Sequence, residues 1–529
     1  MTVRKVRVRF APSPTGPLHI GGVRTALFNY LFARRHGGDF IIRIEDTDSG
    51  RFVPGAEEYI VRALAWCNIL PNEGLTSEGS VAEKPDAKNP HAPYRQSQRK
   101  ALYRKYAEQL VESGHAYYAF DTPETLDALR KEAETKKETF IYNHAVRTRL
   151  QTSLVMPAGE VAARLQQDRH WVVRFKMPES REVNMHDLIR GDVTVNTATL
   201  DDKVLWKAAD GLPTYHLANI VDDHLMDISH VIRGEEWLPS LPLHYLLYEA
   251  FGWTDTQPEF AHLPLLLKPD GKGKLSKRDG DRLGFPVFPL AWKDPLSGDF
   301  SRGYREDGYF PEAFINLLAL LGWNPGTEQE LFSLEELVNL FGLDRVIKSG
   351  AKFNPDKAKW FNQQVLRMKS NEELARLYQE ELRERGIVAA DDYVAQICGF
   401  IKERATFVKD FWDLSAYFFE APTSYDEKAV RKYWNSETLD LMELLAATLK
   451  SIEPFTNENI EFAVNKWIKE NNLNVGAVMN AFRLCIVGAS KGPGMFEIAA
   501  LLKKEEILRR MNSVILKKNH YICLLFNKK

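Results

Sequence analysis

The pattern of hydrophobic and polar residues changes from a strand period to a helix period within the first forty positions. Residues 3–10 alternate apolar and basic side chains, which is the two-residue period of a β-strand. After the break "APSPTGP", apolar residues recur at helical spacing over 20–36, and Gly37 and Gly38 supply a stop. The segment "DFIIRIED" (39–46) then predicts a second strand. This β-α-β order predicts the start of a doubly wound parallel sheet, in which ligands gather at the carboxyl ends of the strands.

Further along the chain, the same pattern is interrupted and then resumes. Helical patterns and mixed strands run to about residue 200, and the strand, loop and helix pattern returns over 214–267. The proline-rich segment 71–93 predicts a surface loop. Beyond residue 310, leucine-rich amphipathic helices dominate. We therefore expect an α/β protein with a split, doubly wound (Rossmann-type) parallel sheet, an inserted α+β domain and a C-terminal all-helical region.

The length of 529 residues requires more than one hydrophobic core. The changes of pattern place the predicted boundaries. We expect the first half of the sheet domain at 1–110, the inserted domain at 111–200, the second half of the sheet domain at 201–280, a helical segment at 281–350 and a C-terminal helical domain at 351–529.

Composition narrows the class of protein. Lys plus Arg (70) nearly equals Asp plus Glu (72), so any surface for nucleic acid must be local. The last thirty residues, with eight basic and two acidic side chains, are one basic segment. The four cysteines are scattered, which argues against disulfides and against a structural zinc site. No run of about 18 apolar residues and no signal-peptide core occurs, so we expect no membrane association and a cytoplasmic location.

The first turn of the β-α unit, "PSPTGPLHIGG" (12–22), has the residues of an anion site. Gly21 and Gly22 allow a ligand to approach closely, and the helix that they open offers free N–H groups. His19 precedes them as a further donor. The spacing matches neither the dinucleotide motif nor the P-loop, and a purely structural glycine pair is the alternative.

Polar residues elsewhere could bind an amino acid or a metal. Glu45, Asp46 and Asp48 follow the second strand, where they could hold an ammonium group or a metal, or cap the next helix. Tyr215 and Asn219 share a helical face. Adjacent residues in "DDH" (222–224) point apart, so hydrogen bonding is favoured over one shared metal.

Two basic features complete the candidates. Arg233 is a planar donor suited to a carboxylate, or a surface ion pair. The segment "KPDGKGKLSKRDG" (268–280) carries five Lys or Arg residues within eleven positions, and Lys274 and Lys277 flank Ser276. On its own residues the segment fits either a phosphate clamp or a solvated turn.

Several blocks together resemble class I aminoacyl-tRNA synthetases, and more narrowly the bacterial-type glutamyl-tRNA synthetases. They occur in family order over roughly the first 280 residues, and "FNPDKAKWFN" (353–362) resembles the entry to the family's anticodon-binding region. "KLSKR" departs from the class pattern K-M-S-K-S but keeps both lysines. The blocks are "RFAPSPTGPLHIGGVRTALFNYLFAR", "RIEDTD", "YRQSQR", "TYHLANIVDDHLMDISHVIRGEEW" and "KLSKRDG".

The resemblance implies activation of L-glutamate with ATP and transfer of the glutamyl group to the terminal adenosine of tRNA(Glu). The inserted domain would bind the tRNA acceptor end, 281–350 would contact the stem, and 351–529 would bind the anticodon. Mg²⁺ would accompany ATP. The implied catalytic residues are His19, Lys274 and Lys277; those for ATP are His19, Gly21, Gly22, Glu236, Leu265, Lys274, Ser276 and Lys277; those for glutamate are Arg9, Ala11, Ser13, Glu45, Tyr215, Asn219 and Arg233.

Relatives of this family differ in zinc content. Some carry a zinc knuckle in the inserted domain, whereas this chain has Tyr118 and Phe120 where cysteines would stand. We expect no zinc, no protein-bound metal and a monomer.

Three alternatives stay open. One is a glutaminyl-tRNA synthetase, whose first block usually resembles P-E-P-S-G-Y-L-H-I-G-H, whereas this chain has "PSPTGPLHIGG". A truncated paralogue that modifies a tRNA base would lack the helical region. A non-catalytic RNA-binding protein would be expected to have lost His19, Lys274 or Lys277.

Overall fold

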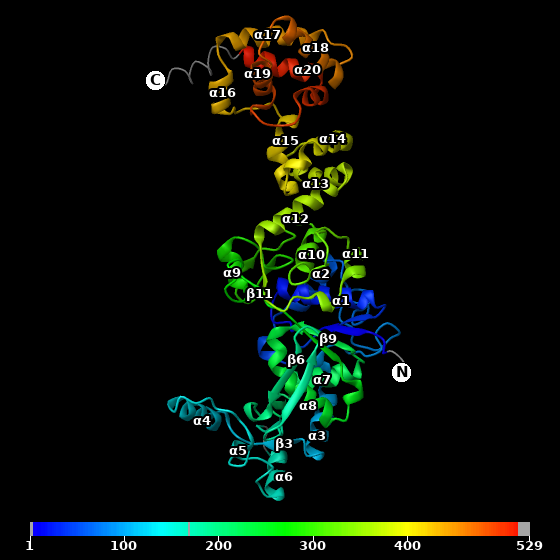
Figure 1. Ribbon diagram of the computed structural model, residues 1–529, viewed down its shortest axis with the longest axis vertical. Coiled ribbons are helices and arrows are strands. Elements are labelled where there is room, and N and C mark those ends of the chain that lie inside the picture. Colours follow the sequence, from blue (N-terminus) through cyan, green and yellow to red (C-terminus); the bar gives the residue numbers. More distant parts are fainter. Residues whose placement is uncertain (1–3, 168–169, 517–529) are drawn as a thin grey trace. The chain divides into compact units, whose positions relative to one another are not determined.

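The computed structural model describes residues 4–167 and 170–516. The chain divides into two compact units, Met1–Phe361 and Asn362–Lys529. The first unit contains every strand of the described residues, and the second is wholly helical (Figure 1). The basic segment predicted at the C-terminus lies mostly outside the described residues.

The predicted β-α-β unit is present at the start of the first unit. Strands β1 (Arg7–Phe10) and β2 (Asp39–Ile42) pair in parallel, and helix α1 (Ile20–Arg35) connects them. The α1 helix packs on β1, β2 and the later strand β9 (His230–Gly234). Arg9, one of the basic residues that alternate along the first strand, is only 3 % exposed. Parallel strands covered on both faces leave no solvent side.

The second half of the sheet comes from residues far along the chain. Strand β10 (Glu259–Leu263) pairs in parallel with β9 and with β5 (Glu182–Asp187), and β6 (Gly191–Asn196) is antiparallel to β5. The two halves meet where the Ser229 N–H donates to the Arg7 carbonyl, 2.9 Å away. The predicted split, doubly wound parallel sheet is therefore confirmed.

A separate antiparallel sheet lies between the two halves in the sequence. Its order is β3-β4-β7-β8, and it extends past residue 200. The hairpin of β5 and β6 falls within the segment 111–200, yet it belongs to the sheet of β9 and β10. The strands of the antiparallel sheet are β3 (Ala116–Ala119), β4 (Val172–Phe175), β7 (Val204–Lys207) and β8 (Leu212–Pro213).

Other helices and short strands complete the first unit. The helices are α2 (Ala56–Trp66), α3 (Lys100–Glu112), α4 (Pro123–Thr135), α5 (His144–Arg147), α6 (Ala158–Gln167), α7 (Tyr215–Leu225), α8 (Leu241–Ala250), α9 (Lys277–Leu283), α10 (Pro311–Ala319) and α11 (Leu334–Leu340). The strands are β11 (Leu266–Leu267), paired with β14 (Ala351–Lys352), and β12 (Trp292–Lys293), paired with β13 (Phe300–Ser301). Short 3₁₀ helices are η1 (Ser49–Arg51), η2 (Gln96–Arg99), η3 (Thr197–Thr199), η4 (Glu235–Ser240), η5 (Thr254–Thr256) and η6 (Leu343–Arg345).

The helical region predicted after residue 310 continues into the second unit. Helix α12 (Pro355–Met368) leads into it, and the chain is coloured yellow to red there (Figure 1). Its elements are α13 (Asn371–Glu384), α14 (Asp391–Ile401), η7 (Lys402–Arg404), η8 (Val408–Asp410), α15 (Phe411–Phe419), α16 (Glu427–Tyr433), α17 (Ser436–Lys450), α18 (Asn457–Glu470), α19 (Val475–Val487) and α20 (Met495–Leu516).

The segment 71–93 is a loop with many exposed residues, as predicted, but part of it is buried against the sheet. Its backbone lies along the edge of β2, where the Ile42 N–H donates to the Glu73 carbonyl at 3.1 Å and the Asn72 N–H donates to the Phe40 carbonyl at 3.0 Å. Asn89 is fully buried and accepts the Gly74 N–H. The segment thus covers a strand edge that would otherwise expose unpaired backbone groups.

None of the helices within the described ranges has the length and apolar character needed to traverse a lipid bilayer.

Candidate active site

A pocket of about 430 Å³ lies at the carboxyl ends of β1, β2 and β9, beside the start of α1. This is the position expected for a ligand in a doubly wound sheet. The pocket brings together eleven of the residues singled out in the sequence. They are Arg9, Ala11, Ser13, His19, Gly21, Gly22, Glu45, Tyr215, Asn219, Arg233 and Glu236.

The start of α1 forms one wall. His19 is the N-cap residue, and its Nδ1 accepts the Gly21 N–H at 3.2 Å. The sequence suggested His19 as a donor, but this nitrogen is an acceptor because the helix leaves its first N–H groups without backbone partners. The proton of the neutral ring is therefore on Nε2.

The two glycines of this turn differ in their surroundings. A Cβ on Gly21 would lie 3.5 Å from His19 Nδ1, an ordinary contact, whereas a Cβ on Gly22 would come within 2.5 Å of Leu18 Cδ1. A side chain at position 22 would therefore require the Leu18 side chain to move. Gly21 is required only if something occupies the pocket against it.

A buried network of charges holds the opposite wall. The Arg43 side chain is fully buried and donates to Asp223 Oδ1 (2.7 Å) and Glu45 Oε1 (3.2 Å). Arg9 Nε donates to the same Asp223 carboxylate at 3.1 Å, and Asn219 Nδ2 donates to Glu45 Oε1 at 3.1 Å. The terminal nitrogens of Arg9 make no hydrogen bond to any described residue. Arg9 and Glu45 therefore each present polar atoms to the pocket while their other atoms are fixed.

The network affects how these groups ionise. Burial raises the pKa of Glu45, although Arg43 and Arg9 oppose the shift. Burial also disfavours the charged form of Asp223, but Arg9 and Arg43 outweigh it and lower the pKa of Asp223. The carboxylates of Asp223, Asp222 and Glu45 likewise overcome burial and raise the pKa of Arg43. Asp223 and Arg43 are thus a charged support, whereas Glu45 is the acidic group that takes up a proton more readily.

Arg233 lies on the third wall, on strand β9. Its NH1 donates to the Tyr215 hydroxyl at 2.7 Å, and its NH2 donates to the Trp237 carbonyl at 3.3 Å. Tyr215 and Asn219 both project from the first turns of α7, as their spacing predicted. The pocket is therefore lined by two arginines, Arg9 and Arg233, and by the carboxylates of Glu45 and Glu236.

The lysine segment reaches the rim of the pocket through one residue. Lys274 Nζ pairs with Glu236 Oε1 at 2.9 Å. Burial would raise the pKa of Glu236, but the hydrogen bond from Lys274, a backbone hydrogen bond and the charges of Lys274 and Arg24 together lower it. Lys277 begins α9, and its side chain lies outside the part that the structure describes.

Three other predicted features are placed differently. The Ser276 hydroxyl donates to Asp279 Oδ2 at 2.6 Å, which fixes the start of α9 and does not direct the hydroxyl toward the pocket. Leu265 does not line the pocket, and its N–H donates to Glu235 at 2.9 Å. Gly280, the last residue of the lysine segment 268–280, lies inside α9, where a Cβ would come within 2.8 Å of the Phe285 carbonyl.

The acidic run 222–224 forms hydrogen bonds, as the sequence favoured. Asp222 accepts from Gln96, Arg99 and Tyr103 at 2.7–3.0 Å, and the His224 ring stacks on Trp253. Over residues 4–167 and 170–516, no three His, Cys, Asp or Glu side chains are grouped so as to hold a metal.

Sequence reasoning missed part of the support of the site. His262 is fully buried, and its Nε2 accepts from Arg233 Nε at 2.9 Å. Its Nδ1 lies 2.6 Å from Asp187 Oδ2. The one available signal was the position of His262 in a short apolar strand, where a polar residue must find a partner.

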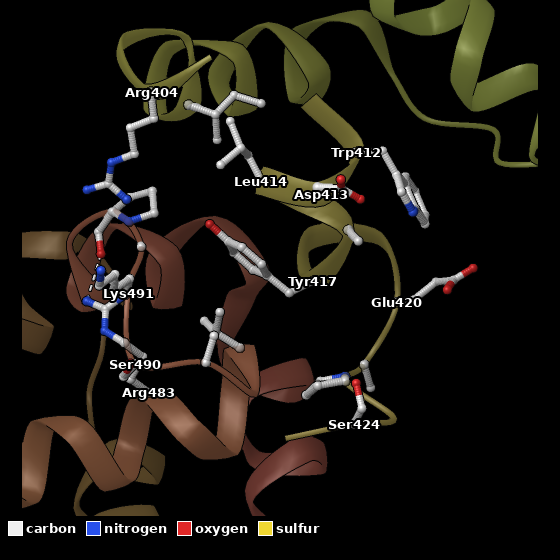
Figure 2. A pocket seen from close by; sticks show the side chains of 18 of the residues that line it. Arg404, Trp412, Asp413, Leu414, Tyr417, Glu420, Ser424, Arg483, Ser490 and Lys491 are labelled. Carbon is white, nitrogen blue, oxygen red and sulfur yellow. Dashed lines mark hydrogen bonds between the residues drawn. The ribbon is translucent and has the colours of Figure 1, made fainter. Parts of the chain in front are cut away.

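A second pocket lies within the helical unit and has a volume of about 760 Å³ (Figure 2). In this view Tyr417 lies near its centre, and Arg404, Arg483 and Lys491 lie to one side. Arg483 NH2 donates to the Pro493 carbonyl at 2.7 Å, and burial lowers the pKa of Arg483. Cationic groups beside an aromatic ring suit an anionic ligand with a planar group.

Family models match most of the chain. A model described as "tRNA synthetases class I (E and Q), catalytic domain" matches residues 5–360. A second, described as "Anticodon binding domain", matches residues 373–515.

Relatives match over nearly their full length. A glutamate–tRNA ligase of Phocaeicola vulgatus is 58 % identical over 515 residues, which cover 97 % of this chain and 99 % of that protein. A glutamate–tRNA ligase of Flavobacterium johnsoniae is 58 % identical over 512 residues, with the same coverage. The crystal structure of a glutamate tRNA ligase from Elizabethkingia meningosepticum in complex with its amino acid has a TM-score of 0.91 and 52 % identity, over 97 % of this chain and 99 % of that one.

Proposed function

This chain belongs to the glutamate–tRNA ligases among the class I tRNA synthetases, and from that premise we propose how its pocket carries out the reaction. In the first step a carboxylate oxygen of L-glutamate attacks the α-phosphorus of ATP, and pyrophosphate leaves. In the second step a hydroxyl of the terminal adenosine of tRNA(Glu) attacks the acyl carbon, and AMP leaves.

The arrangement of charge in the pocket is the observation that supports this proposal most. Arg9 and Arg233 line it together with Glu45. An amino acid with an acidic side chain needs cationic donors for its carboxylate and an anion for its ammonium group. Uncharged analogues would leave these buried charges without partners, which is costly.

We assign glutamate binding to the residues that line this part of the pocket. Glu45 would hold the ammonium group, and Arg9 and Arg233 would hold carboxylate oxygens. Tyr215 and Asn219 would contribute neutral hydrogen bonds. Ala11 and Ser13, on the segment after β1, would shape the wall beside them.

We assign ATP binding to the start of α1 and the lysine segment. Gly21 and Gly22 would let the nucleotide approach the helix N-terminus, and His19 would donate from Nε2. Glu236 and Leu265 would lie near the nucleotide. Lys274 and Lys277 would neutralise charge that develops on the departing pyrophosphate, and Ser276 would hold the start of α9 between them.

Mg²⁺ would accompany ATP. In this pocket Glu236 is already paired with Lys274, so we expect phosphate oxygens to provide most of the ligands. The ion would offset phosphate charge during the transfer.

The rest of the chain would bind tRNA. We propose that the inserted domain contacts the acceptor end, that 281–350 contacts the stem and that the helical unit binds the anticodon. The pocket of Figure 2 supports the last assignment, since Arg404 and Lys491 can meet phosphates and Tyr417 offers a ring to a base.

Three further expectations extend this proposal. Tyr118 packs edge-to-face on Trp171 with ring centroids 5.1 Å apart, and Phe120 is buried. Because aromatic packing occupies the positions where some relatives have zinc ligands, we propose that the enzyme needs no zinc. We also propose a monomer that acts in the cytoplasm.

The deciding experiment is charging of purified tRNA(Glu) and tRNA(Gln) with glutamate and with glutamine. We expect glutamate to be joined to tRNA(Glu) and glutamine to neither tRNA. Preferential charging with glutamine would replace the proposal by the glutaminyl alternative. An absence of ATP–pyrophosphate exchange with glutamate and tRNA(Glu) would favour the non-catalytic alternative.

A further inference from the structure

Arg233 is held by a chain of buried polar groups that crosses three neighbouring strands. In the parallel ladder of β9 and β10, Arg233 is the register partner of His262. Asp187 ends β5, the next strand of the same sheet. Arg233 is 5 % exposed, His262 0 % and Asp187 1 %, so water does not substitute for these contacts.

The direction of each hydrogen bond follows from the chemistry of arginine. A guanidinium only donates, so the 2.9 Å contact from Arg233 Nε requires an unprotonated Nε2 on His262. The proton of the neutral imidazole is then on Nδ1, which donates to Asp187 Oδ2 at 2.6 Å. Burial lowers the pKa of His262, which favours this neutral form.

Asp187 is itself fixed by backbone donors. Its Oδ1 accepts the N–H groups of Arg190 at 2.8 Å, Ile189 at 3.0 Å and His262 at 3.3 Å. Burial alone would raise the pKa of Asp187, but the hydrogen bonds from His262 and the backbone lower it. The carboxylate is therefore an ionised, immobile acceptor.

The far end of this chain of groups points to the pocket. With Nε engaged by His262, Arg233 directs NH1 to the Tyr215 hydroxyl and NH2 to the Trp237 carbonyl. Arg233, Tyr215 and Trp237 all line the pocket. The plane of the guanidinium, and with it the position of Tyr215, thus depends on His262.

We infer that Asp187 and His262 are positioning residues: Asp187 fixes the tautomer of His262, and His262 fixes the orientation in which Arg233 binds glutamate. This inference rests on the role proposed for Arg233. Neither residue lines the pocket. They act on the bound glutamate through Arg233, in the way that a partner behind a catalytic or metal-bound group sets its geometry.

Three substitutions test this chain of buried groups without a large change of volume. Asp187→Asn replaces an acceptor by an amide, which favours the proton of His262 on Nε2, where it would oppose the Arg233 Nε–H. His262→Asn removes the acceptor near Arg233. His262→Gln can place an oxygen close to the position of Nε2 and so should retain part of the contact.

The measurement is KM for glutamate and for ATP in ATP–pyrophosphate exchange with tRNA(Glu) present. We expect Asp187→Asn and His262→Asn to raise the KM for glutamate by about tenfold or more, and that for ATP by less than about twofold. The KM for glutamate of His262→Gln should be closer to the wild-type value than that of His262→Asn. In an Arg233→Ala background, Asp187→Asn should have no further effect on the KM for glutamate, because substitutions within one hydrogen-bond network are not additive.

A matched control comes from another histidine and aspartate pair, which lies on the hairpin that carries Asp187. His186 Nδ1 lies 2.7 Å from Asp192 Oδ1, and both side chains are exposed. Asp192→Asn breaks a pair of the same chemistry with no connection to Arg233, so both KM values should stay at the wild-type level.

The outcomes separate this inference from the function on which it rests. If Arg233→Ala raises the KM for glutamate but folded Asp187→Asn and His262→Asn do not, the inference is overturned and the site remains. If Asp187→Asn has its full effect without Arg233, the inference is also overturned. If Arg233→Ala leaves the KM for glutamate unchanged, the assignment of Arg233 falls and the inference with it. If thermal melting shows that Asp187→Asn does not fold, the two His262 variants decide. The inference then requires a higher KM for glutamate in His262→Asn than in His262→Gln, and equal values would overturn it.

Discussion

Single charged residues in the pocket are tuned by neighbours that never face it. Glu45 shares Arg43 with Asp223, which also anchors Arg9. One buried arginine therefore couples the carboxylate assigned to the substrate ammonium with an arginine assigned to a substrate carboxylate. A substitution of Arg43 would therefore weaken binding of both the ammonium group and a carboxylate of the amino acid.

Glu45 gives a prediction about pH. Burial raises its pKa, so on acidification Glu45 takes up a proton at a higher pH than an ordinary glutamate, whose pKa is about 4.3. Protonation removes the partner of the ammonium group. The KM for glutamate should therefore rise as the pH falls through the raised pKa, above the range in which the substrate's own side chain titrates.

The control is Glu45→Gln, measured by exchange over the same pH range. Its KM for glutamate should be higher by about tenfold or more and should lack the rise on the acid side. Identical acid limbs in the two proteins would show that Glu45 is not the titrating group.

At this scale the sequence placed the residues that line the pocket but not those behind them. Arg9, Glu45 and Arg233 could be named because each lies in a short block with family resemblance. The support of Arg233 by Asp187 could not, since Asp187 reaches Arg233 only through parallel pairing of β5, β10 and β9. No local pattern encodes that pairing.

At the scale of the elements, the start of α1 contains two glycines whose surroundings differ. This yields a paired prediction for alanine substitutions. Gly21→Ala meets only ordinary contacts and should leave the melting temperature unchanged while raising the KM for ATP. Gly22→Ala places its Cβ against Leu18 and should cost about 1 kcal/mol of stability.

Thermal melting and exchange kinetics on the two variants test this division. A Gly21→Ala enzyme with wild-type KM for ATP would contradict the placement of the nucleotide at this turn. A Gly22→Ala protein as stable as wild type would show that Leu18 relaxes without cost.

Helix α9 gives a prediction about Ser276. Both the N–H and the hydroxyl of Ser276 donate to Asp279, and these hydrogen bonds lower the pKa of Asp279 to about 2. We expect Ser276→Ala to lower kcat for exchange by loosening the helix start that carries Lys277. Ser276→Asn, a favourable residue at a helix start, should retain most of the activity.

The comparison separates two roles for Ser276. If the hydroxyl contacts phosphate directly, asparagine and alanine should reduce kcat to the same extent. The Asp279 carboxylate is the partner that the sequence motif alone did not reveal, because "SKRD" also fits a simple basic turn.

Elements with periodic patterns were predicted well, whereas aperiodic ones were not. α1 and β2 begin and end within a few residues of the predicted bounds. The segment 71–93 was predicted as a loop, but its contact with the sheet was not, because that contact comes from the buried Asn89 and from backbone pairing with β2. Composition alone cannot distinguish such a segment from a solvated loop.

At the scale of the whole molecule, the pocket proposed for glutamate and ATP and the pocket proposed for the tRNA anticodon lie in different units. The pocket with Arg9 and Arg233 belongs to the first unit, and the pocket with Arg404 belongs to the second. Substitutions in the second unit should therefore alter tRNA use without altering the binding of small substrates.

Arg404→Ala tests this separation. We expect the KM for tRNA(Glu) in charging to rise by about tenfold, with the KM for glutamate and ATP unchanged. Arg431→Ala is a matched control, since Arg431 is an exposed arginine of the same unit that does not line the pocket. Equal effects of the two substitutions would indicate a diffuse electrostatic contribution instead of a defined site.

The hairpin of β5 and β6 limits how this protein can be re-engineered. It lies in the sequence between strands of the antiparallel sheet, yet it delivers the carboxylate behind Arg233. A chimera that exchanges the whole segment between β2 and β9 would exchange a part of the amino-acid site with it. A graft meant to change only tRNA preference should therefore retain the recipient's own Glu182–Asn196.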